Sequence, residues 1–343
     1  MKLLQEELAK KGLDCAIFAT YEDTNPNLFY FTGYIGAGFL VVPASGKPIL
    51  HVPSRDLTQA KNVKDVIVSS GKKLSEVLSE RKVIAKKIGI DFVNATVSEA
   101  NMLKERFECE LFDLTDFMNE LRAVKGKNEI DKITKACQIT DKIIGKFIDN
   151  FKTFKTEEEA SAFLVYESRK LGCGLAFEPI VATGANAAIP HHVPSGKIKM
   201  GFCVVDFGVK FEGYCSDVTR TFYHGKPTKE EEKTYYDLLE NQENAISLIK
   251  PGKMIGDFCI EAEKKLKQKL IHSLGHGLGI EVHEFPNITD NSKVGLREGM
   301  VITIEPGEYV EGRYGIRIED DVLVTKSGCD VLSKFTKKLI IIK

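Results

Sequence analysis

Two strongly apolar segments of this sequence are each followed by a pair of acidic residues. Asp206 directly follows "FCVV" and Glu305 directly follows "VITI", and Asp217 and Glu319 come 11 and 14 residues later. A single acid at the end of a strand is usually solvated or hydrogen-bonded to a turn. Four acids that lie together, however, raise one another's pKa or unfold the site unless positive charge lies among them. These residues therefore favour a site that binds cations.

The segment "IHSLGHGLGIEVHEF" adds imidazole groups to the oxygen donors. It contains three of the seven histidines of the chain, and glycines surround His276, which indicates a backbone packed too closely for side chains. His283 follows on an expected strand. Four carboxylates and an imidazole suit a pair of divalent cations bridged by carboxylates and water. Because no thiolate belongs to the set, a purely structural zinc site is disfavoured.

The two pairs of acids also share a local arrangement. "VVDFG" and "ITIEPG" each predict an apolar strand, an acid, a tight turn, a return strand and a second acid. If this similarity reflects an internal duplication, two hairpins bring four carboxylates to a common centre. The similarity is short, and an accidental match stays open as the alternative.

The elements that must carry these residues indicate two domains, residues 1–122 and 123–343. A single core usually stops growing below this length, so two domains are expected. The first part alternates a helix at 2–11, strands at "CAIFA" and in "GFLVVPASGKPILHV", and two strands around a helix at 97–107. It gathers no cluster of histidine, cysteine and acidic residues. We expect an α/β unit that scaffolds, associates or covers a site.

The second part begins with apolar residues at helical spacing from Glu129 onward, which predicts a long amphipathic helix. Further helices are expected at 156–170, 228–249 and 255–270. Strand segments stand between and after them, among them "EPIVATG", "FCVVDFGVKF" and "GIRIEDDVLVT". This order is typical of an α+β domain in which long helices cover one face of a mainly antiparallel sheet.

Charge and hydropathy narrow the range of partners. The 48 lysines and arginines nearly balance the 49 acidic residues, so no field favours nucleic acid or an anionic membrane. The amino-terminal "MKLLQEELAKKG" lacks the apolar segment of a signal peptide, and no later run is long enough to cross a bilayer. We expect a cytoplasmic protein that binds neither nucleic acid nor membranes.

The eight cysteines are scattered along the chain without a C-x-x-C pair, and we expect them to be buried thiols. Cys203 and Cys215 could face each other across a hairpin. A disulfide between them is the less favoured option, because a reducing compartment keeps thiols free.

Five segments together resemble a known family. "VVDFG", "GYCSDVTRTF", "HSLGHGLGIEVHE", "IEPG" and "GIRIED" occur in the order of the signature segments of the creatinase and prolidase superfamily, metallopeptidases with the pita-bread fold. "LRAVKGKNEIDKI" is similar to the linker into the catalytic domain of that family. The resemblance implies a pita-bread domain over 123–343, a smaller creatinase-like α/β domain over 1–122, and a homodimer. It also implies an Xaa-Pro peptidase of the prolidase or aminopeptidase P type.

The same resemblance implies roles for the metal ligands. Asp206 chelates one metal, Asp217 and Glu319 bridge both metals, and the second metal is completed by His276 and Glu305. The expected cofactor is two divalent ions per chain, with Mn²⁺ first and Co²⁺, Zn²⁺ or Fe²⁺ as alternatives. Because metals lower the pKa of water, a bridging hydroxide would attack the carbonyl that precedes proline. Glu305 would also handle the proton.

Other residues are implied to surround the substrate, a proline-containing dipeptide or short peptide. His191 matches a family histidine that lines the substrate pocket, and His283 matches one near the scissile carbonyl. Arg317 precedes Glu319 by two residues, so both side chains should project to the same side of a strand. Phe177 and Tyr214 are candidates for apolar walls around a proline ring, although core packing explains each equally well.

For three further residues a supporting or structural role is expected. His192 and His272 are more simply explained as histidines that cap or pack, and Thr219, two positions after Asp217, as a donor to a ligand. The main alternative to an enzyme is a non-catalytic pita-bread module that binds a peptide or a protein. Within the enzyme class, the choice between a dipeptidase and an aminopeptidase stays open.

Overall fold

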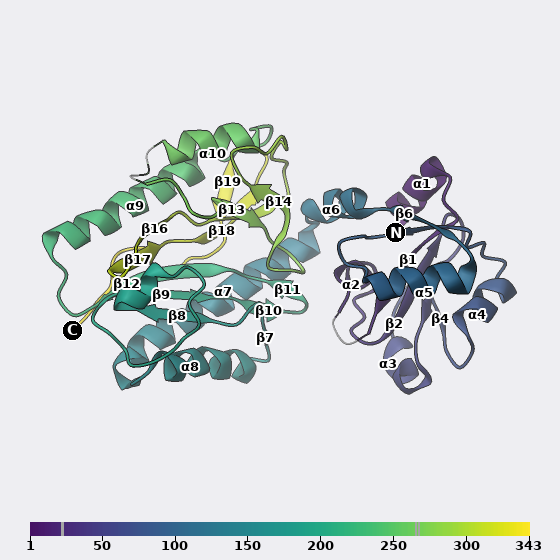
Figure 1. The fold of residues 1–343 in the computed structure, drawn as a ribbon, viewed down its shortest axis with the longest axis horizontal. Coiled ribbons are helices and arrows are strands. Elements are labelled where there is room, and N and C mark those ends of the chain that lie inside the picture. The colour runs from purple at the N-terminus through teal and green to yellow at the C-terminus, as the bar shows by residue number, and fades with distance from the viewer. Residues whose placement is uncertain (22–23, 265, 267) are drawn as a thin grey trace. The chain divides into compact units, whose positions relative to one another are not determined.

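The computed structural model covers residues 1–343, of which it describes all but 22, 23, 265 and 267. The chain divides into two compact units, Met1–Leu121 and Arg122–Lys343 (Figure 1). Within the described residues, no helix combines the length and the apolar character that crossing a membrane requires.

The first unit is built on one six-stranded sheet with the order β4-β3-β2-β1-β5-β6. Its strands are β1 (Cys15–Thr20), β2 (Gly38–Pro43), β3 (Ile49–His51), β4 (Ile67–Ser69), β5 (Lys87–Ile90) and β6 (Glu110–Asp113). β2 pairs antiparallel with β1 and β3, and the other neighbours are parallel. The strands predicted in this part of the sequence are confirmed.

Helices of the first unit supply apolar side chains to both faces of the sheet. They are α1 (Lys2–Lys11), α2 (Pro26–Thr32), α3 (Leu57–Ala60), α4 (Leu74–Glu80), α5 (Val97–Phe107) and α6 (Thr115–Ala123). β1 is buried on both faces, because Phe18 packs with Leu4 in one core and Ile17 packs with Leu103 in the other. α1 ends at Gly12, whose φ of 65° costs a glycine little.

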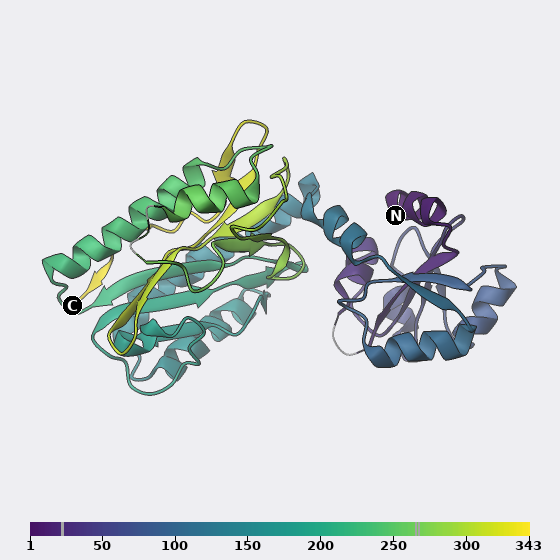
Figure 2. The ribbon, with the colours of Figure 1, turned by 45° about the horizontal axis from the view of Figure 1, so that its top comes forward.

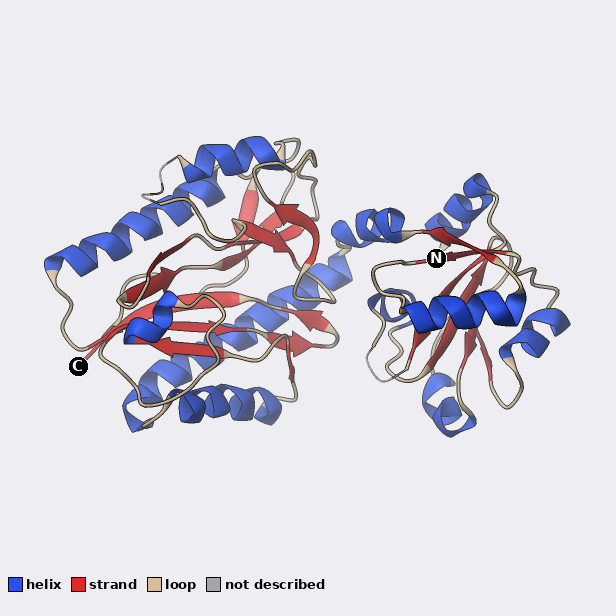
Figure 3. Cartoon of the chain, viewed as in Figure 1, coloured by secondary structure: helices blue, strands red, loops and turns tan. Residues whose placement is uncertain are grey.

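The second unit contains two main sheets with the orders β20-β12-β9-β8 and β14-β13-β15-β18-β19. The first consists of β8 (Ile180–Thr183), β9 (Gly201–Phe207), β12 (Val218–His224) and β20 (Ile341–Ile342); the second of β13 (Gly275–Gly277), β14 (Glu284–Ile288), β15 (Val301–Ile304), β18 (Asp320–Val324) and β19 (Cys329–Val331). Smaller sheets are formed by β7 (Gly174–Leu175), β10 (Val209–Phe211) and β11 (Tyr214–Cys215), and by β16 (Gly307–Val310) and β17 (Tyr314–Arg317). Apart from β12 with β20, all neighbours among the described strands of this unit are antiparallel (Figure 3).

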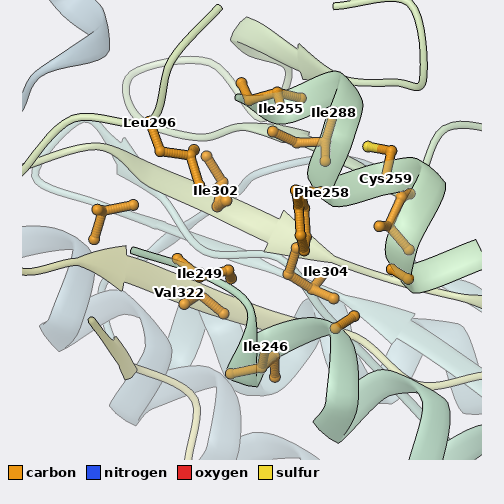
Figure 4. Close-up of a cluster of buried hydrophobic side chains, with 14 of the residues drawn as sticks. Ile246, Ile249, Ile255, Phe258, Cys259, Ile288, Leu296, Ile302, Ile304 and Val322 are labelled. Carbon is orange, nitrogen blue, oxygen red and sulfur yellow. The ribbon is translucent and has the colours of Figure 1, made fainter. Parts of the chain in front are cut away.

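Two pairs of helices pack against the main sheets of the second unit (Figure 2). α7 (Lys127–Asn150) and α8 (Glu157–Lys170) form one core with β9 and β12, and α9 (Lys229–Ser247) and α10 (Ile255–Glu263) form another with β15 and β18. In the second core, Phe258 of α10 lies among Ile302, Ile304 and Val322 (Figure 4). These helices confirm the predicted arrangement of long helices on a mainly antiparallel sheet.

The helix predicted at 255–270 is shorter than expected. α10 ends at Glu263, and the amide of Leu266 donates to the Glu263 carbonyl across a turn. The following segment is rich in lysine, and like charges spaced four residues apart weaken a helix. Residues 265 and 267, which the predicted helix included, lie outside the described residues. All eight cysteines lie among the described residues and are free, so the optional pairing of Cys203 with Cys215 is absent.

The position of Phe258 leads to a prediction about stability. Phe258 is fully buried, so Phe258→Ala should lower the free energy of unfolding by about 3–5 kcal/mol, through lost transfer energy and a residual cavity. Ile260, which lies on the same helix with 48% of its side chain exposed, is the matched control, and Ile260→Ala should cost less than about 1 kcal/mol. Urea unfolding measures both; equal losses would contradict this packing.

Candidate metal centre

The first pair of acids lies at the ends of two neighbouring strands. Asp206 is the penultimate residue of β9, opposite Thr219 of β12 in the antiparallel register. Asp217 immediately precedes β12 and is 4% exposed. Because the two strands pair directly, both carboxylates reach the same end of the sheet. Asp206 therefore interrupts the apolar run because β9 places a carboxylate at this end of the sheet.

The second pair of acids repeats this arrangement in the other main sheet. Glu305 follows the last residue of β15, and Glu319 precedes the first residue of β18. β15 and β18 are antiparallel neighbours, and Gly277 of β13 pairs with Ile302 of β15 on the other side. The backbone thus carries His276, the central residue of β13, to the same end as Glu305 and Glu319.

The two pairs converge into one cluster of potential metal ligands. Three groups each offer ligand atoms within 4.8 Å of one another: Asp206 with Asp217 and Glu319, His276 with Glu305 and Glu319, and Asp217 with His276 and His283. The structure therefore brings together all five residues that were predicted as ligands. It adds His283 to them, which sequence reasoning had placed beside the scissile bond.

His276 is oriented toward the acids by its backbone. Its Nδ1 donates to the Gly277 carbonyl at 3.1 Å, so the proton resides on Nδ1 and the lone pair of Nε2 is available. Nε2 lies 3.5 Å from Oδ2 of Asp217 and 3.4 Å from Oε1 of Glu305. Burial, with the nearby His283, lowers the pKa of His276 to about 4, which keeps this imidazole neutral at physiological pH.

Burial and mutual repulsion act strongly on the carboxylates. The pKa of Asp217 is raised well above its ordinary value by burial and by the charge of Glu319. The pKa of Glu319 is raised in the same way by burial and by Glu305, while burial raises that of Glu305 to about 7. Cations among these oxygens would reverse the effect, because opposite charge favours the ionised form.

The unsatisfied oxygens of the cluster fit divalent cations. Oδ1 of Asp206 and Oδ1 of Asp217 are buried and find no hydrogen-bond partner among the described residues. Buried charged oxygens are normally paired or bound to metal. The donor set is rich in carboxylate oxygen, includes neutral imidazole and lacks thiolate, and it suits Mn²⁺, Co²⁺, Fe²⁺ or Zn²⁺.

Arg317 connects the acids to the surrounding wall. Its guanidinium donates to Oδ2 of Asp206 at 2.7 Å and to Oγ1 of Thr219 at 3.1 Å, and it also contacts the Tyr309 hydroxyl at 2.9 Å. The Thr219 hydroxyl in turn donates to Oε2 of Glu319 at 2.7 Å. The structure thus places Arg317 and Thr219 as direct hydrogen-bond donors to the acids.

Sequence reasoning missed Tyr309 and assigned His272 to packing. The hydroxyl of Tyr309 lies 3.0 Å from Nε2 of His272 and accepts from Arg317. The pairing of β16 with β17 is the only signal that could have indicated Tyr309, because it puts this side chain on the same sheet face as Arg317. Both residues belong to the polar surroundings of the cluster.

The two histidines predicted near the substrate lie on irregular segments. The ring of His283 stands edge-on to that of His276, with centroids 4.3 Å apart. His283 occupies a bend before β14 and not a strand, because the Glu284 carboxylate accepts the backbone amides of Ile280 and Glu281 and curls this segment. His191 is exposed. Burial lowers the pKa of His272 and that of His283.

The two aromatic residues predicted as pocket walls are held differently. Phe177 is partly exposed, and its ring lies beneath Gly208, where a Cβ would come within 3.1 Å of the ring. Tyr214 is buried, donates to Oε1 of Glu129 at 3.1 Å and lies under the ammonium of Lys132. Phe177 is thus close to the strand of Asp206, whereas these contacts connect Tyr214 to α7.

A buried ionic network supports the segment that carries His283. Arg122 and Lys125 both contact Glu284, with 3.2 Å between Nζ of Lys125 and Oε2, and Arg122 also bonds Glu281 at 2.7 Å. The two cations overcome the effect of burial and lower the pKa of Glu284 to about 2. Glu284 therefore stays ionised and keeps its hold on the backbone that precedes it.

Comparisons with known proteins agree with this geometry. The family model described as "Metallopeptidase family M24" matches residues 131–326, and the one described as "Creatinase/Prolidase N-terminal domain" matches residues 1–124. The Xaa-Pro dipeptidase of Pyrococcus furiosus is 34% identical, covering 99% of this chain and 100% of the relative. That of Pyrococcus horikoshii is also 34% identical, covering 99% and 98%.

Solved structures extend the similarity to the whole fold. The X-Pro aminopeptidase of Thermotoga maritima has a TM-score of 0.90 at 31% identity, covering 99% of this chain and 100% of that chain. The prolidase of Pyrococcus horikoshii OT3 has a TM-score of 0.89 at 32% identity, covering 99% of each chain.

The ionic network around Glu284 leads to a pH-dependent prediction. Glu284→Gln removes the carboxylate charge that two buried cations share and should cost about 3–5 kcal/mol at neutral pH. Because the folded pKa is lowered from the ordinary 4.5 to about 2, the stabilisation is complete above pH 4.5 and is lost as the pH falls toward 2. The difference in unfolding free energy between wild type and variant should shrink over that range.

Glu281 offers the matched control for that experiment. Its side chain is 41% exposed and bonds the same Arg122, so Glu281→Gln should cost less than about 1 kcal/mol. Thermal or urea unfolding of both variants between neutral pH and pH 3 measures the effect. A pH-independent difference for Glu284→Gln would contradict the assignment of charge to this network.

Proposed function

Since the chain belongs to metallopeptidase family M24, with a creatinase-type amino-terminal domain and a pita-bread catalytic domain, we propose that it hydrolyses Xaa-Pro bonds. The substrates would be dipeptides or short peptides, cleaved at the amino-terminal Xaa-Pro bond. Both kinds of named relative support this proposal, the dipeptidases of Pyrococcus and the aminopeptidase of Thermotoga maritima. We assign the catalytic domain to residues 123–343 and the amino-terminal domain to residues 1–122.

One observation carries the proposal: the buried convergence of five ligand side chains from two strand pairs and β13. They are Asp206, Asp217, His276, Glu305 and Glu319. Asp206 would hold one divalent cation, Asp217 and Glu319 would lie between two, and His276 and Glu305 would hold the second. Two bound cations, with Mn²⁺ proposed first, would polarise the scissile carbonyl and lower the pKa of water to supply hydroxide as nucleophile.

The remaining groups of the chain would orient and protonate the substrate. Glu305 would carry the proton between the attacking water and the leaving amine, since its carboxylate lies within the ligand cluster. His191 and His283 would donate to the peptide carbonyl as negative charge develops on its oxygen. Arg317 would fix Asp206 through their 2.7 Å contact, and Phe177 would provide apolar surface for the proline ring.

We further propose that the enzyme acts as a homodimer in the cytoplasm. The family resemblance supports the homodimer. The eight free cysteines are typical of a reducing compartment, which supports the location.

The substrate assay tests the proposed function and decides between its two forms. Purified protein is supplied with Mn²⁺ or Co²⁺ and given Ala-Pro, Ala-Pro-Ala and, as a control without proline, Ala-Ala. A strong loss of turnover from Ala-Pro to Ala-Pro-Ala identifies a dipeptidase, and comparable turnover identifies an aminopeptidase. We expect little hydrolysis of Ala-Ala. If neither proline peptide is cleaved, the alternative of a non-catalytic module that binds a peptide or protein is favoured.

Removal of the central carboxylate tests the ligand assignment. Asp217→Ala should lower both the number of bound metal ions and the activity, the latter at least about a hundred-fold, because even partners of ligands contribute ten- to a hundred-fold. Asp330→Ala changes an exposed acid in β19 of the adjoining sheet and should alter neither quantity. Elemental analysis together with the peptide assay measures both, and full metal occupancy in Asp217→Ala would rule out this role.

A further inference from the structure

A carboxylate that the proposed reaction does not use is fully buried at the start of α8. Glu157 is the first residue of this helix and is 0% exposed. An ionised carboxylate is costly to bury unless its oxygens are hydrogen-bonded. Here the oxygens accept several donors, and all of these donors come from one stretch of chain, residues 183–195.

The donors occupy the beginning, the middle and the end of that stretch. Oε1 of Glu157 accepts the amide of Thr183 at 2.7 Å, its hydroxyl at 2.6 Å and Nδ2 of Asn186 at 3.1 Å. Oε2 accepts Nδ2 of Asn186 at 3.0 Å and the amide of Ser195 at 3.0 Å, and it lies 2.7 Å from Nε2 of His192. One carboxylate thus fixes the curvature of the whole segment.

The backbone at the start of α8 reinforces this attachment. The amide of Glu157 donates to the Gly196 carbonyl at 3.0 Å, and that of Ile198 donates to the Lys155 carbonyl at 3.1 Å. The segment therefore leaves β8 at Thr183 and returns to the same helix terminus. Apolar packing contributes little, because the local core consists of Ala182, Ala187 and Val204 with Ile180.

The segment also contacts Arg317, which hydrogen-bonds Asp206 of the metal-ligand cluster. Nη1 of Arg317 donates to the carbonyl of Pro190 at 3.3 Å. Pro190 is the residue directly before His191. At Gly315, two residues before Arg317, a Cβ would come within 1.8 Å of the Ala187 carbonyl oxygen, so the segment lies directly on β17.

Two adjacent histidines are therefore divided between two environments. His192 is 9% exposed and contacts Glu157, whereas His191 is exposed. A carboxylate suits this position because it only accepts hydrogen bonds and has four lone-pair directions. A glutamine would turn an amino group toward the donors of Asn186 and Ser195.

We propose that Glu157 is a positioning residue that holds segment 183–196 so that His191 stays beside the metal-ligand cluster. This role rests on the proposed function, in which His191 contacts the substrate. It does not require Glu157 to touch substrate or metal.

The kinetic experiment compares Glu157→Ala with Glu159→Gln in the full-length protein loaded with Mn²⁺. Glu159 is an exposed residue on the same helical turn that caps the amide of Lys155 and controls for damage to the helix. Because a displaced reacting group costs up to about a hundred-fold, Glu157→Ala should lower kcat by about ten- to a hundred-fold. The metal content and the KM should change little, and Glu159→Gln should behave as wild type.

A double-mutant cycle distinguishes positioning from general damage. If Glu157 acts through His191, adding Glu157→Ala to His191→Ala should lower kcat less than about two-fold further, because the two effects are coupled. Independent, multiplying losses, or an unchanged kcat in Glu157→Ala alone, would overturn the proposal.

Hydrogen exchange provides a readout that does not depend on catalysis. In Glu157→Ala, amides within 184–196 should exchange faster while those of β9 remain protected, and unchanged exchange in 184–196 would overturn the proposal. If wild type cleaves no Xaa-Pro peptide, the proposed function fails, and this measurement still decides whether Glu157 holds the segment. If Glu157→Ala does not fold, His192→Ala removes one donor; it should give smaller changes of the same kind, and their absence would overturn the proposal.

Discussion

Four carboxylates meet where two antiparallel strand pairs end, and their repulsion must be balanced by donors and by positive charge. The chain supplies part of this balance itself. Arg317 holds one oxygen of Asp206 while the other has no partner among the described residues, and Thr219 holds one oxygen of Glu319. The acids are thus oriented without being neutralised. The negative charge that remains on these carboxylates makes the site suited to cations. The surrounding strands hold the carboxylates together in spite of their repulsion.

Close backbone approach is the second requirement, and it explains the glycines around His276. A Cβ at Gly275 would lie 1.9 Å from the Thr303 carbonyl oxygen, and one at Gly277 would lie 2.4 Å from that of Phe285. β13 therefore fits between β14 and β15 only with glycines on both sides of the histidine. Without that fit, Nε2 of His276 would not reach Asp217 and Glu305 together.

Much of this organisation could be predicted because it depends on local patterns. Apolar runs, the caps of the helices and the acids that interrupt strands are visible in the sequence, and they predicted both units and the convergence of the acids. The predicted end of the helix at 255–270 was wrong, because α10 ends at Glu263. The bend at His283 could not be predicted, since it depends on how Glu284 is held by Arg122 and Lys125, far away in the chain.

Polar groups that act across the fold were the hardest to recognise. Tyr309 carries no signal in its own segment, and its contact with Arg317 depends on strand pairing and on space above Gly307, where a Cβ would lie 2.5 Å from the Tyr309 hydroxyl. From the sequence alone, His272 is interpreted as a packing residue. Its hydrogen bond with the Tyr309 hydroxyl becomes evident only in the structure. Residue type therefore predicted which acids and histidine converge better than it predicted the polar groups around them.

The different environments of His191 and His192 limit the changes in length that this segment can tolerate. Thr183 and Ser195 bond the same buried carboxylate, so the number of residues between them is fixed by a closed path. Deleting one residue ahead of the pair would shift His192 toward the position of His191 and leave Glu157 facing another side chain. Such a chain would keep a histidine at the cluster but would lose the contact between His192 and Glu157 that holds the segment. Insertions and deletions within residues 184–194 should therefore be tolerated less well than substitutions.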